Sequence, residues 1–403
     1  MKSDGPQRVA ARSRGSVVQA LDVVGAAAAM PSQQPMPGSG TPVRDRSLPA
    51  PGPPGQVSPA PAVLQARDAQ SEQRRALRAY AQPDLRRSLT QIATSVVPYV
   101  ALWVVMYRMI GISLVAVLLL AIPAAGFQVR TFILFHDCSH GSFLPSKRAN
   151  RWLGAVLGLL VLAPYRRWSH DHAIHHATSG DLDRRGVGDI PTLTLTEYAA
   201  RSRRGRLAYR LFRNPLVMFG IGPILAMMIG PRITSRAQRP RLRHSVLGTD
   251  VAIALVVGGL CWLIGWKDFL LVWGPSSLLA GSVGIWLFYV QHQFEDTYWT
   301  QSSDWSYVDA ALYGSSYLKL PKLLQFFSGN IGLHHVHHLN AKIPNYNLQR
   351  AHDENPMFHQ VPVLTLRDGL RAMRLKLWDE SHGTLITFAQ AHRRLAPQHL
   401  TTR

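Results

Sequence analysis

The chain has 403 residues, of which 47% are hydrophobic, and its 44 lysines and arginines against 23 acidic residues give a net charge of +21. Such an excess of positive charge indicates a nucleic acid or an anionic membrane surface as a partner. Only two cysteines are present, Cys138 within a histidine-rich stretch and Cys261 within an apolar one. This usage excludes a disulfide framework and indicates a reducing compartment.

The first 62 residues contain eleven prolines among many Ala, Gly and Ser residues, and no secretory signal peptide is visible. This composition is typical of a disordered leader. A transit peptide is the alternative, because the segment is rich in arginine and poor in acidic residues, but it lacks amphipathic periodicity. Residues 63–88 are predicted to be a basic juxtamembrane segment, either a helix on the membrane surface or a solvated linker.

Four segments are long and apolar enough to cross a membrane as helices, which takes roughly 20 residues. They are residues 89–107, 111–135, 247–266 and 269–290. Only a few residues separate the members of each consecutive pair, which predicts two helical hairpins. Two charged residues within them, Arg130 and Asp250, lie near enough to the ends of their segments to reach the membrane interface.

Two further apolar stretches, residues 152–164 and 215–230, are too short or too irregular to be predicted as spans. Thirteen Lys and Arg residues lie in 136–213 and five arginines in 231–243. If residues 215–230 crossed the membrane, these basic regions would lie on opposite sides, against the cytoplasmic preference of positive loops. We therefore predict four spans, a re-entrant or interfacial segment at 215–230, and cytoplasmic termini and basic loops. The positive net charge is then suited to the anionic lipid surface of the cytoplasmic side, and we find no sequence motif that indicates nucleic-acid binding.

Ten of the 17 histidines fall in three short windows on the cytoplasmic side of this topology. The windows read HDCSH, HDHAIHH and HHVHH and begin at His136, His170 and His334. Residues three and four apart share a helix face, so H-x-x-x-H and H-x-x-H-H each present an arc of imidazoles. Two histidines, His170 and His335, lie off the arcs. The arcs contain His136, His140, His172, His175, His176, His334, His337 and His338.

Neutral imidazole suits zinc, copper, iron and nickel, and eight such ligands are too many for one ion and fit two. A soluble di-iron bundle uses Glu-x-x-His pairs, which these windows lack. A structural zinc site takes four ligands, and a transport pathway places ionisable residues deep within the spans. The pattern therefore predicts a histidine-ligated dimetal centre for redox chemistry at the membrane surface. A non-enzymatic, histidine-rich membrane metal-binding protein is the alternative from another class.

Four stretches, FHDCSHGSF, WSHDHAIHHATSGDLDRR, YVQHQFEDTYW and HHVHHLNAKIPNY, resemble those of the membrane fatty acid desaturases. The branch they resemble is the acyl-lipid omega-6 (delta-12) type. The resemblance implies an all-α integral membrane protein, in which four transmembrane helices in two hairpins carry a cytoplasmic helical cap with a histidine-rich dimetal site. The membrane desaturase domain is expected at residues 89–365, and a C-terminal cytoplasmic tail at residues 366–403.

The resemblance also implies the reaction that the protein catalyses and its cellular location. The expected reaction uses O2 and two iron ions, held by the eight box histidines, to insert a cis double bond into a lipid-linked acyl chain. Family members carry a further ligand between the last span and the third box, and His292 is the candidate here. Because related enzymes with the same boxes hydroxylate or ketolate, a membrane di-iron hydroxylase or ketolase is the alternative. A multi-pass protein of a bacterial inner membrane is expected.

Hydrogen-bond acceptors behind the ligands fix the tautomers of metal-bound imidazoles. Three polar residues lie near enough in sequence to do so, or are solvated surface residues: Asp137, Asp171 and Asn330. Trp168 and Tyr165 line the acyl route or belong to an interfacial aromatic belt. No cytochrome b5 haem motif is found, so a separate electron carrier, ferredoxin-like or cytochrome b5-like, is expected. The cluster RSRRGR at residues 201–206 suits an acidic carrier or anionic lipid.

Overall fold

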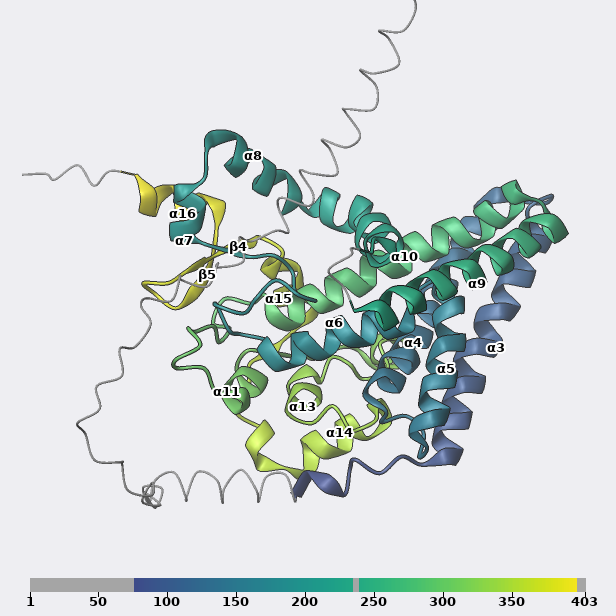
Figure 1. Ribbon diagram of the computed structural model, residues 1–403, viewed down its shortest axis with the longest axis horizontal. Helices are drawn as coiled ribbons and strands as arrows, with labels where there is room; N and C mark the ends of the chain where they lie inside the picture. Colours follow the sequence, from purple (N-terminus) through teal and green to yellow (C-terminus); the bar gives the residue numbers. More distant parts are fainter. Residues whose placement is uncertain (1–75, 235–238, 397–403) are drawn as a thin grey trace, which may run out of the picture. The chain divides into compact units, whose positions relative to one another are not determined.

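The computed structural model of the chain describes residues 76–234 and 239–396 (Figure 1). The predicted leader, residues 1–62, and the first half of the predicted juxtamembrane segment, residues 63–75, lie outside these ranges. The elements named below belong to the unit that begins at Tyr80.

Four helices are long and apolar enough to cross a membrane, as the sequence predicts. They are α3 (Leu85–Met109), α4 (Leu114–His140), α9 (Pro240–Ile264) and α10 (Trp266–His292). Helix α3 packs against α4, and α9 packs against α10 (Figure 1). The break between α9 and α10 falls at Gly265, whose φ of 84° is readily adopted only by glycine.

Arg130 and Asp250, the two charged residues noted within the predicted segments, both contact other protein groups. Arg130 is buried on α4, where its guanidinium donates to the carbonyl of Phe326 and lies 4.0 Å from the centre of that ring. Asp250 on α9 forms an ion pair with Arg232, at 3.3 Å between Oδ1 and Nε. A protein carbonyl and an aromatic ring thus compensate the buried charge of Arg130.

The segment predicted to be re-entrant follows the basic helix α8 (Arg203–Phe212). It continues as two π-helical turns and a 3₁₀ turn, namely η1 (Val217–Ile221), η2 (Pro223–Ile229) and η3 (Gly230–Arg232). The chain bends by 58° between α8 and this segment, as a broken span or a re-entrant loop does. Pro223 has no amide hydrogen to donate, which breaks the regular α-helical ladder at this point.

The remaining helices are short and lie between or after the spans. They are α5 (Lys147–Leu160), α6 (Tyr165–Thr178), α7 (Leu195–Ala200), α11 (Tyr307–Leu312), α12 (Lys322–Phe327), α13 (His334–Leu339), α14 (Asn345–Glu354), η4 (Pro356–Phe358), α15 (Leu366–Ala372) and α16 (Phe388–Leu395). Helices α5 and α6 pack against each other, and both also contact α4 and α9.

The fold is mostly helical, but the described residues also contain two small sheets, which the all-α prediction missed. In the first, β4 (Leu375–Asp379) pairs in parallel with β1 (Leu193–Thr194) and antiparallel with β5 (Thr384–Thr387). In the second, β2 (Tyr317–Leu318) pairs in parallel with β3 (Val363–Leu364). Residues of the predicted C-terminal tail thus form a hairpin that is paired with the segment following α6.

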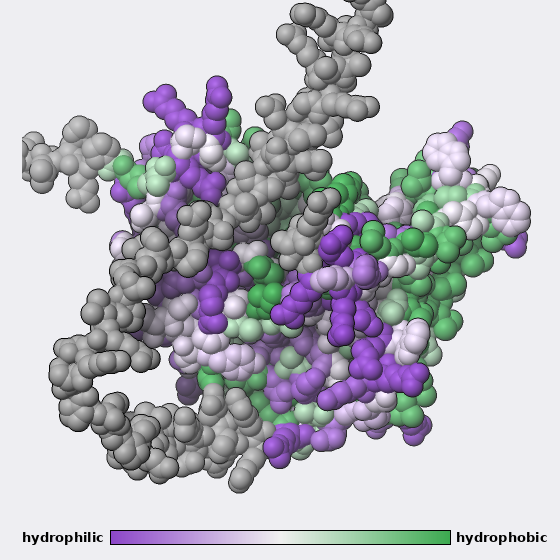
Figure 2. Space-filling model, in the orientation of Figure 1, coloured by the Kyte–Doolittle hydropathy of each residue, from purple (hydrophilic) through white to green (hydrophobic). Residues whose placement is uncertain are grey.

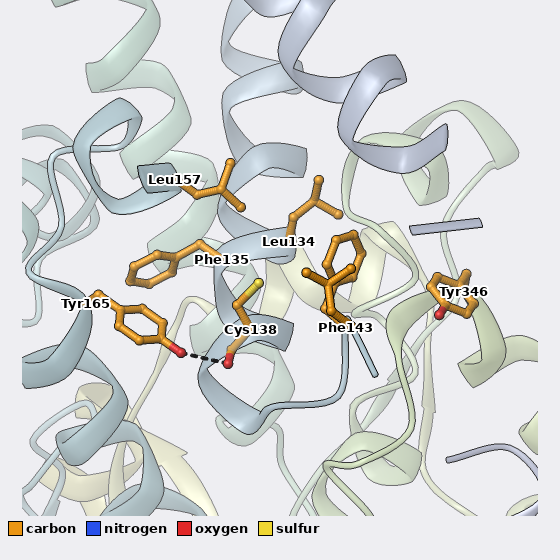
Figure 3. Close-up of a cluster of buried hydrophobic side chains, with 8 residues drawn as sticks. Leu134, Phe135, Cys138, Phe143, Leu157, Tyr165 and Tyr346 are labelled. Atoms are coloured by element: carbon orange, nitrogen blue, oxygen red, sulfur yellow. Dashed lines mark hydrogen bonds between the residues drawn. The ribbon is translucent and has the colours of Figure 1, made fainter. Parts of the chain in front are cut away.

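A hydrophobic cluster fixes the first histidine box against the helices that follow it (Figure 3). It contains Leu134, Phe135, Cys138, Phe143, Leu144, Leu157, Tyr165 and Tyr346. The hydroxyl of Tyr165 donates to the carbonyl of Cys138 over 2.7 Å. A Cβ at Gly154 would lie 2.2 Å from the Tyr165 ring, so only glycine allows α6 to approach α5 this closely.

Candidate metal centre

Nine histidine side chains converge from four helices and form two adjacent groups. Within each group, one nitrogen from every side chain lies within 4.8 Å of the others. The first group contains His136, His140, His172, His176 and His337, and the second contains His175, His292, His334 and His338. The structure thus brings together all eight box histidines and His292, the further ligand candidate.

Helical phase decides which group each histidine joins. On α6, His172 and His176 are four residues apart and enter the first group, whereas His175 enters the second. On α13 the pair four residues apart, His334 and His338, enters the second group instead. On a helix, residues i and i+4 point in nearly the same direction, whereas residue i+3 points to the other side of residue i. The second and third boxes therefore each contribute to both groups, whereas both histidines of the first box join the first group.

The nitrogen positions fit metal ligation. In the first group, His176 Nε2 lies 3.1 Å from His172 Nε2 and 3.0 Å from His337 Nε2. In the second, His292 Nε2 lies 3.2 Å from the Nε2 of His175 and 2.9 Å from that of His334. Nitrogen ligands bound at about 2.1 Å and at right angles around one ion are about 3.0 Å apart.

Burial and unmet hydrogen bonding support the same conclusion. Several buried imidazole nitrogens have no hydrogen-bond partner among the described residues, including Nε2 of His140 and His338. Burial, reinforced by the neighbouring imidazoles, lowers the pKa of five ligand candidates well below the ordinary value: His172, His176, His334, His337 and His338. These side chains are therefore neutral near pH 7, and neutral imidazole is the form that binds metals.

Of the three predicted acceptors behind the ligands, only Asp137 contacts a ligand candidate within the described residues. Its Oδ1 lies 3.1 Å from His136 Nδ1, and its Oδ2 accepts from the backbone and side-chain amides of Asn345 at 2.7 and 2.8 Å. Asp171 instead accepts from Arg167 Nε at 2.5 Å. The side chain of Asn330 donates to the carbonyl of Asn345 at 3.0 Å.

Two acceptors that sequence reasoning missed lie behind the second group. Asp189 Oδ1 is 2.5 Å from His175 Nδ1, and the carbonyl of Gly314 is 3.0 Å from His292 Nδ1. Asp189 follows Gly188, whose φ is 72° and whose Cβ would lie 2.8 Å from the carbonyl of Asp171. The sequence signal that could have revealed Asp189 is the preceding glycine, Gly188, because a glycine there lets this loop pass close to α6.

The two histidines predicted to lie off the arcs are outside both groups. His170 is exposed on α6. His335 is buried, but its Nε2 lies 3.1 Å from Nδ1 of His352, away from the two groups. Trp168 stacks on His172, with ring centres 4.3 Å apart, and therefore holds that imidazole from one side.

A large apolar cavity opens onto both groups. It has a volume of about 440 Å³ and is bounded by α4, α6, α10 and residues 218–231, with His136, His172 and His334 at one end. Along α10 its lining extends from Gln291 to Trp273, about 27 Å at the helical rise per residue. Trp168 is part of the cavity lining, which agrees with the first of its two predicted roles, that of lining the acyl route. The cavity suits a long, thin apolar ligand.

A fully buried arginine holds the segments around the second group together. Arg213 donates to the carbonyl of Pro191 at 2.8 Å and to Gln293 Oε1 at 3.0 Å. Pro191 follows Asp189 by two residues, and Gln293 directly follows the ligand candidate His292. Arg213 also donates to the carbonyl of Leu375 on β4 at 3.4 Å. The C-terminal hairpin is thereby connected to the support of the histidines.

Comparisons with known proteins agree with this geometry. The chain matches the fatty acid desaturase family over residues 111–363, which include all nine histidines. It is 48% identical over 310 residues to a fatty acid desaturase of Bacillus subtilis, covering 77% of this chain and 88% of that protein. It is 30% identical over 228 residues to an sn-1 acyl-lipid omega-3 desaturase (ferredoxin) of Synechocystis, covering 55% and 62%.

An sn-1 oleoyl-lipid 12-desaturase of the same Synechocystis strain is 25% identical over 233 residues, covering 55% of this chain and 63% of that protein. The family match spans more than half of the chain, and the Bacillus relative is matched over most of its length. The chain therefore belongs to the fatty acid desaturase family and is an oxidoreductase of lipid metabolism.

Proposed function

We propose that the protein inserts a cis double bond into a lipid-linked acyl chain, in an O2-dependent reaction at two iron ions, one in each histidine group. The observation that carries the proposal is the position of both groups at one end of the long apolar cavity. An all-imidazole donor set of five and four side chains suits iron without the carboxylates that would add negative charge. Iron bound there would supply the activation of O2.

The residues of the chain present the acyl chain to that centre. The apolar walls bind the methylenes, and His136, His172 and His334 form the end of the cavity where the reacting carbons would lie. For each double bond, two hydrogens leave neighbouring carbons, and O2 takes them up with two electrons and two protons from outside, forming two waters. Burial of the imidazoles excludes bulk water from this end, which limits side reactions.

We propose that the double bond is placed at the delta-12 (omega-6) position. The similarity to an oleoyl-lipid 12-desaturase and the omega-6 character of the first two boxes support this assignment. A ferredoxin-like electron carrier is proposed because one relative is named as a ferredoxin-dependent enzyme. The exposed arginines of α8, Arg203 and Arg204, offer an acidic carrier a complementary surface.

We further propose four spans with the histidine groups on the cytoplasmic face of a bacterial inner membrane. The distribution of arginine on both sides of residues 215–230 supports this orientation. In this arrangement the bent segment does not cross the membrane, and its irregular backbone is covered by α10.

Fatty-acid profiling of an expression host tests the proposal. The host should gain a cis-unsaturated acid whose double bond mass spectrometry locates at delta-12, and a His172→Ala variant present at the same level should produce none. A new double bond elsewhere would overturn the positional assignment alone. Hydroxy or keto acids as the main products would overturn desaturation.

A further inference from the structure

A second cavity lies on the outer side of α5 and α6, apart from the one that reaches the histidines. It has a volume of about 320 Å³. Its lining consists of Arg148, Arg151, Trp152, Ala155, Tyr165, Arg166, Ser245 and Thr249. We call it the arginine groove. The four α5 residues follow one another at helical spacing and share a face, and Ser245 and Thr249 share a face of α9. The groove is thus built where three helices meet.

The charge of the groove is positive and unbalanced. Arg148, Arg151 and Arg166 are exposed, and none of them forms an ion pair or a hydrogen bond within the described part of the chain. The nearest acidic side chains in sequence are already engaged, since Asp250 pairs with Arg232 and Asp171 with Arg167. Three guanidinium groups in the groove are therefore available to bind an anion.

Further donors point to an anion with several oxygens. Helix α6 begins at Tyr165 without a side-chain cap, which leaves the free amides of its first turn available beside Arg166. The hydroxyl of Thr249 donates to the carbonyl of Ser245 at 2.9 Å, and the Ser245 hydroxyl has no partner within the described residues. Phosphate oxygens are the acceptors that guanidinium forks, amides and hydroxyls bind together.

The surroundings of the groove indicate a lipid. Trp152 is 66% exposed at its rim, and Val156 on α5 and Val251 on α9 are exposed just beyond it. Tryptophan beside arginine, followed by apolar side chains, is typical of the level of the headgroups in a bilayer. In Figure 2 the hydrophilic area over α5 and the start of α9 adjoins the hydrophobic flank of the long helices. An anion bound there would have its acyl chains against that flank.

We propose that the arginine groove binds the phosphodiester headgroup of an anionic phospholipid that is a resident ligand and not the acyl chain being desaturated. Basic pockets between membrane helices on the cytoplasmic side recognise such headgroups. The bound lipid would contact α5, α6 and α9 at once. It would thereby hold the start of α6, which carries the second histidine box, against its neighbours.

Native mass spectrometry of the full chain in detergent, with added phosphatidylglycerol or phosphatidylcholine, tests the proposal. The wild type should retain one phosphatidylglycerol in preference to phosphatidylcholine. A triple variant, Arg148→Gln, Arg151→Gln and Arg166→Gln, should bind it on the order of 100-fold more weakly. The charge-matched control, Arg203→Gln, Arg204→Gln and Arg206→Gln on α8, should bind it as the wild type does. Melting temperatures of both variants check that each is folded.

Four results would overturn the proposal. Equal losses in the two triple variants would show that surface charge alone attracts the lipid. Displacement of the lipid by millimolar inorganic phosphate would show a site for free phosphate. Unchanged lipid retention in the groove variant, together with loss of binding to an acidic ferredoxin, would show that the groove docks a protein. A wild type that prefers neither lipid would refute the proposal without any variant.

Discussion

Nδ1 of His175 lies 2.5 Å from a carboxylate oxygen of Asp189, a residue 14 positions further along the chain. The ring nitrogen Nε2 of the same histidine points at His292 within the second group. A carboxylate behind an imidazole fixes its orientation and tautomer and makes the other nitrogen a better ligand. Asp189 therefore prepares His175 for metal binding.

Replacing this carboxylate should weaken the second group selectively. Asp189→Asn is expected to lower metal affinity or activity by roughly 10- to 100-fold, measured as bound iron against free iron in detergent. The matched control is Asp171→Asn, whose carboxylate faces Arg167, and it should keep the iron content of the wild type. Equal losses in both variants would show that Asp189 has no particular role in holding His175.

The packing of α10 against the bent segment should leave no room for an added methyl group at Gly281. A Cβ at Gly281 would lie 2.7 Å from Cβ of Pro223, whereas a Cβ at Gly284 would lie 3.7 Å from the end of the Met227 side chain. Gly281→Ala is expected to cost about 1–3 kcal/mol in unfolding free energy and to lower product yield, because the segment forms a wall of the cavity. Gly284→Ala should behave as the wild type in thermal unfolding and in product yield, and a reversed order would contradict this packing.

Lys376 should make stability depend on pH. Burial, and secondly the charge of Arg213, lower the pKa of Lys376 to about 7 from 10.5. Between these two values the unfolded chain holds a proton that the folded chain has lost, so this residue makes stability rise with pH. Lys376→Met should therefore raise the melting temperature most below pH 7, with the gain shrinking toward pH 10.5. The exposed control Lys322→Met should show no such trend. If the increase in melting temperature of Lys376→Met did not vary with pH, the lowered pKa of Lys376 would be contradicted.

The orientation of the bent segment is testable by labelling. Single cysteines replacing Ser202 and His244, which are both exposed and flank the segment, should react with an impermeant thiol reagent from the same side of the membrane. The two native cysteines are removed in this background. Labelling from opposite sides would mean that the segment is a fifth span, and the four-span arrangement would then be wrong.

The histidine arcs could be derived from the sequence because helical phase is a local property. His172, His175 and His176 share one turn of helix whatever surrounds them, and His170 is excluded for the same reason. The partition of these residues into two groups was not predictable from one helix, since it depends on where α13 and α10 approach α6. The four apolar helices were predictable because continuous apolar runs of this length have few other structures available.

Other parts of the site depend on contacts between distant segments. Asp189 and Asp171 are both acidic residues near the second box, and only the path of the loop after α6 decides which one meets a histidine. Arg213 was counted among the positive charges of a cytoplasmic loop, yet it is buried and connects that loop to α10 and β4. Strand β4 pairs with β1, about 180 positions earlier in the chain, which a local pattern does not reveal.

The central claim is that each of the two histidine groups binds one iron ion. The most direct test is metal analysis of the purified, iron-loaded chain, together with single-group variants. The wild type should contain about two irons per chain, and His337→Ala and His338→Ala, which alter neighbouring residues in different groups, should each retain about one. The exposed His170→Ala control should retain two. A single tightly bound zinc in active wild-type protein, or two irons in both group variants, would contradict the account.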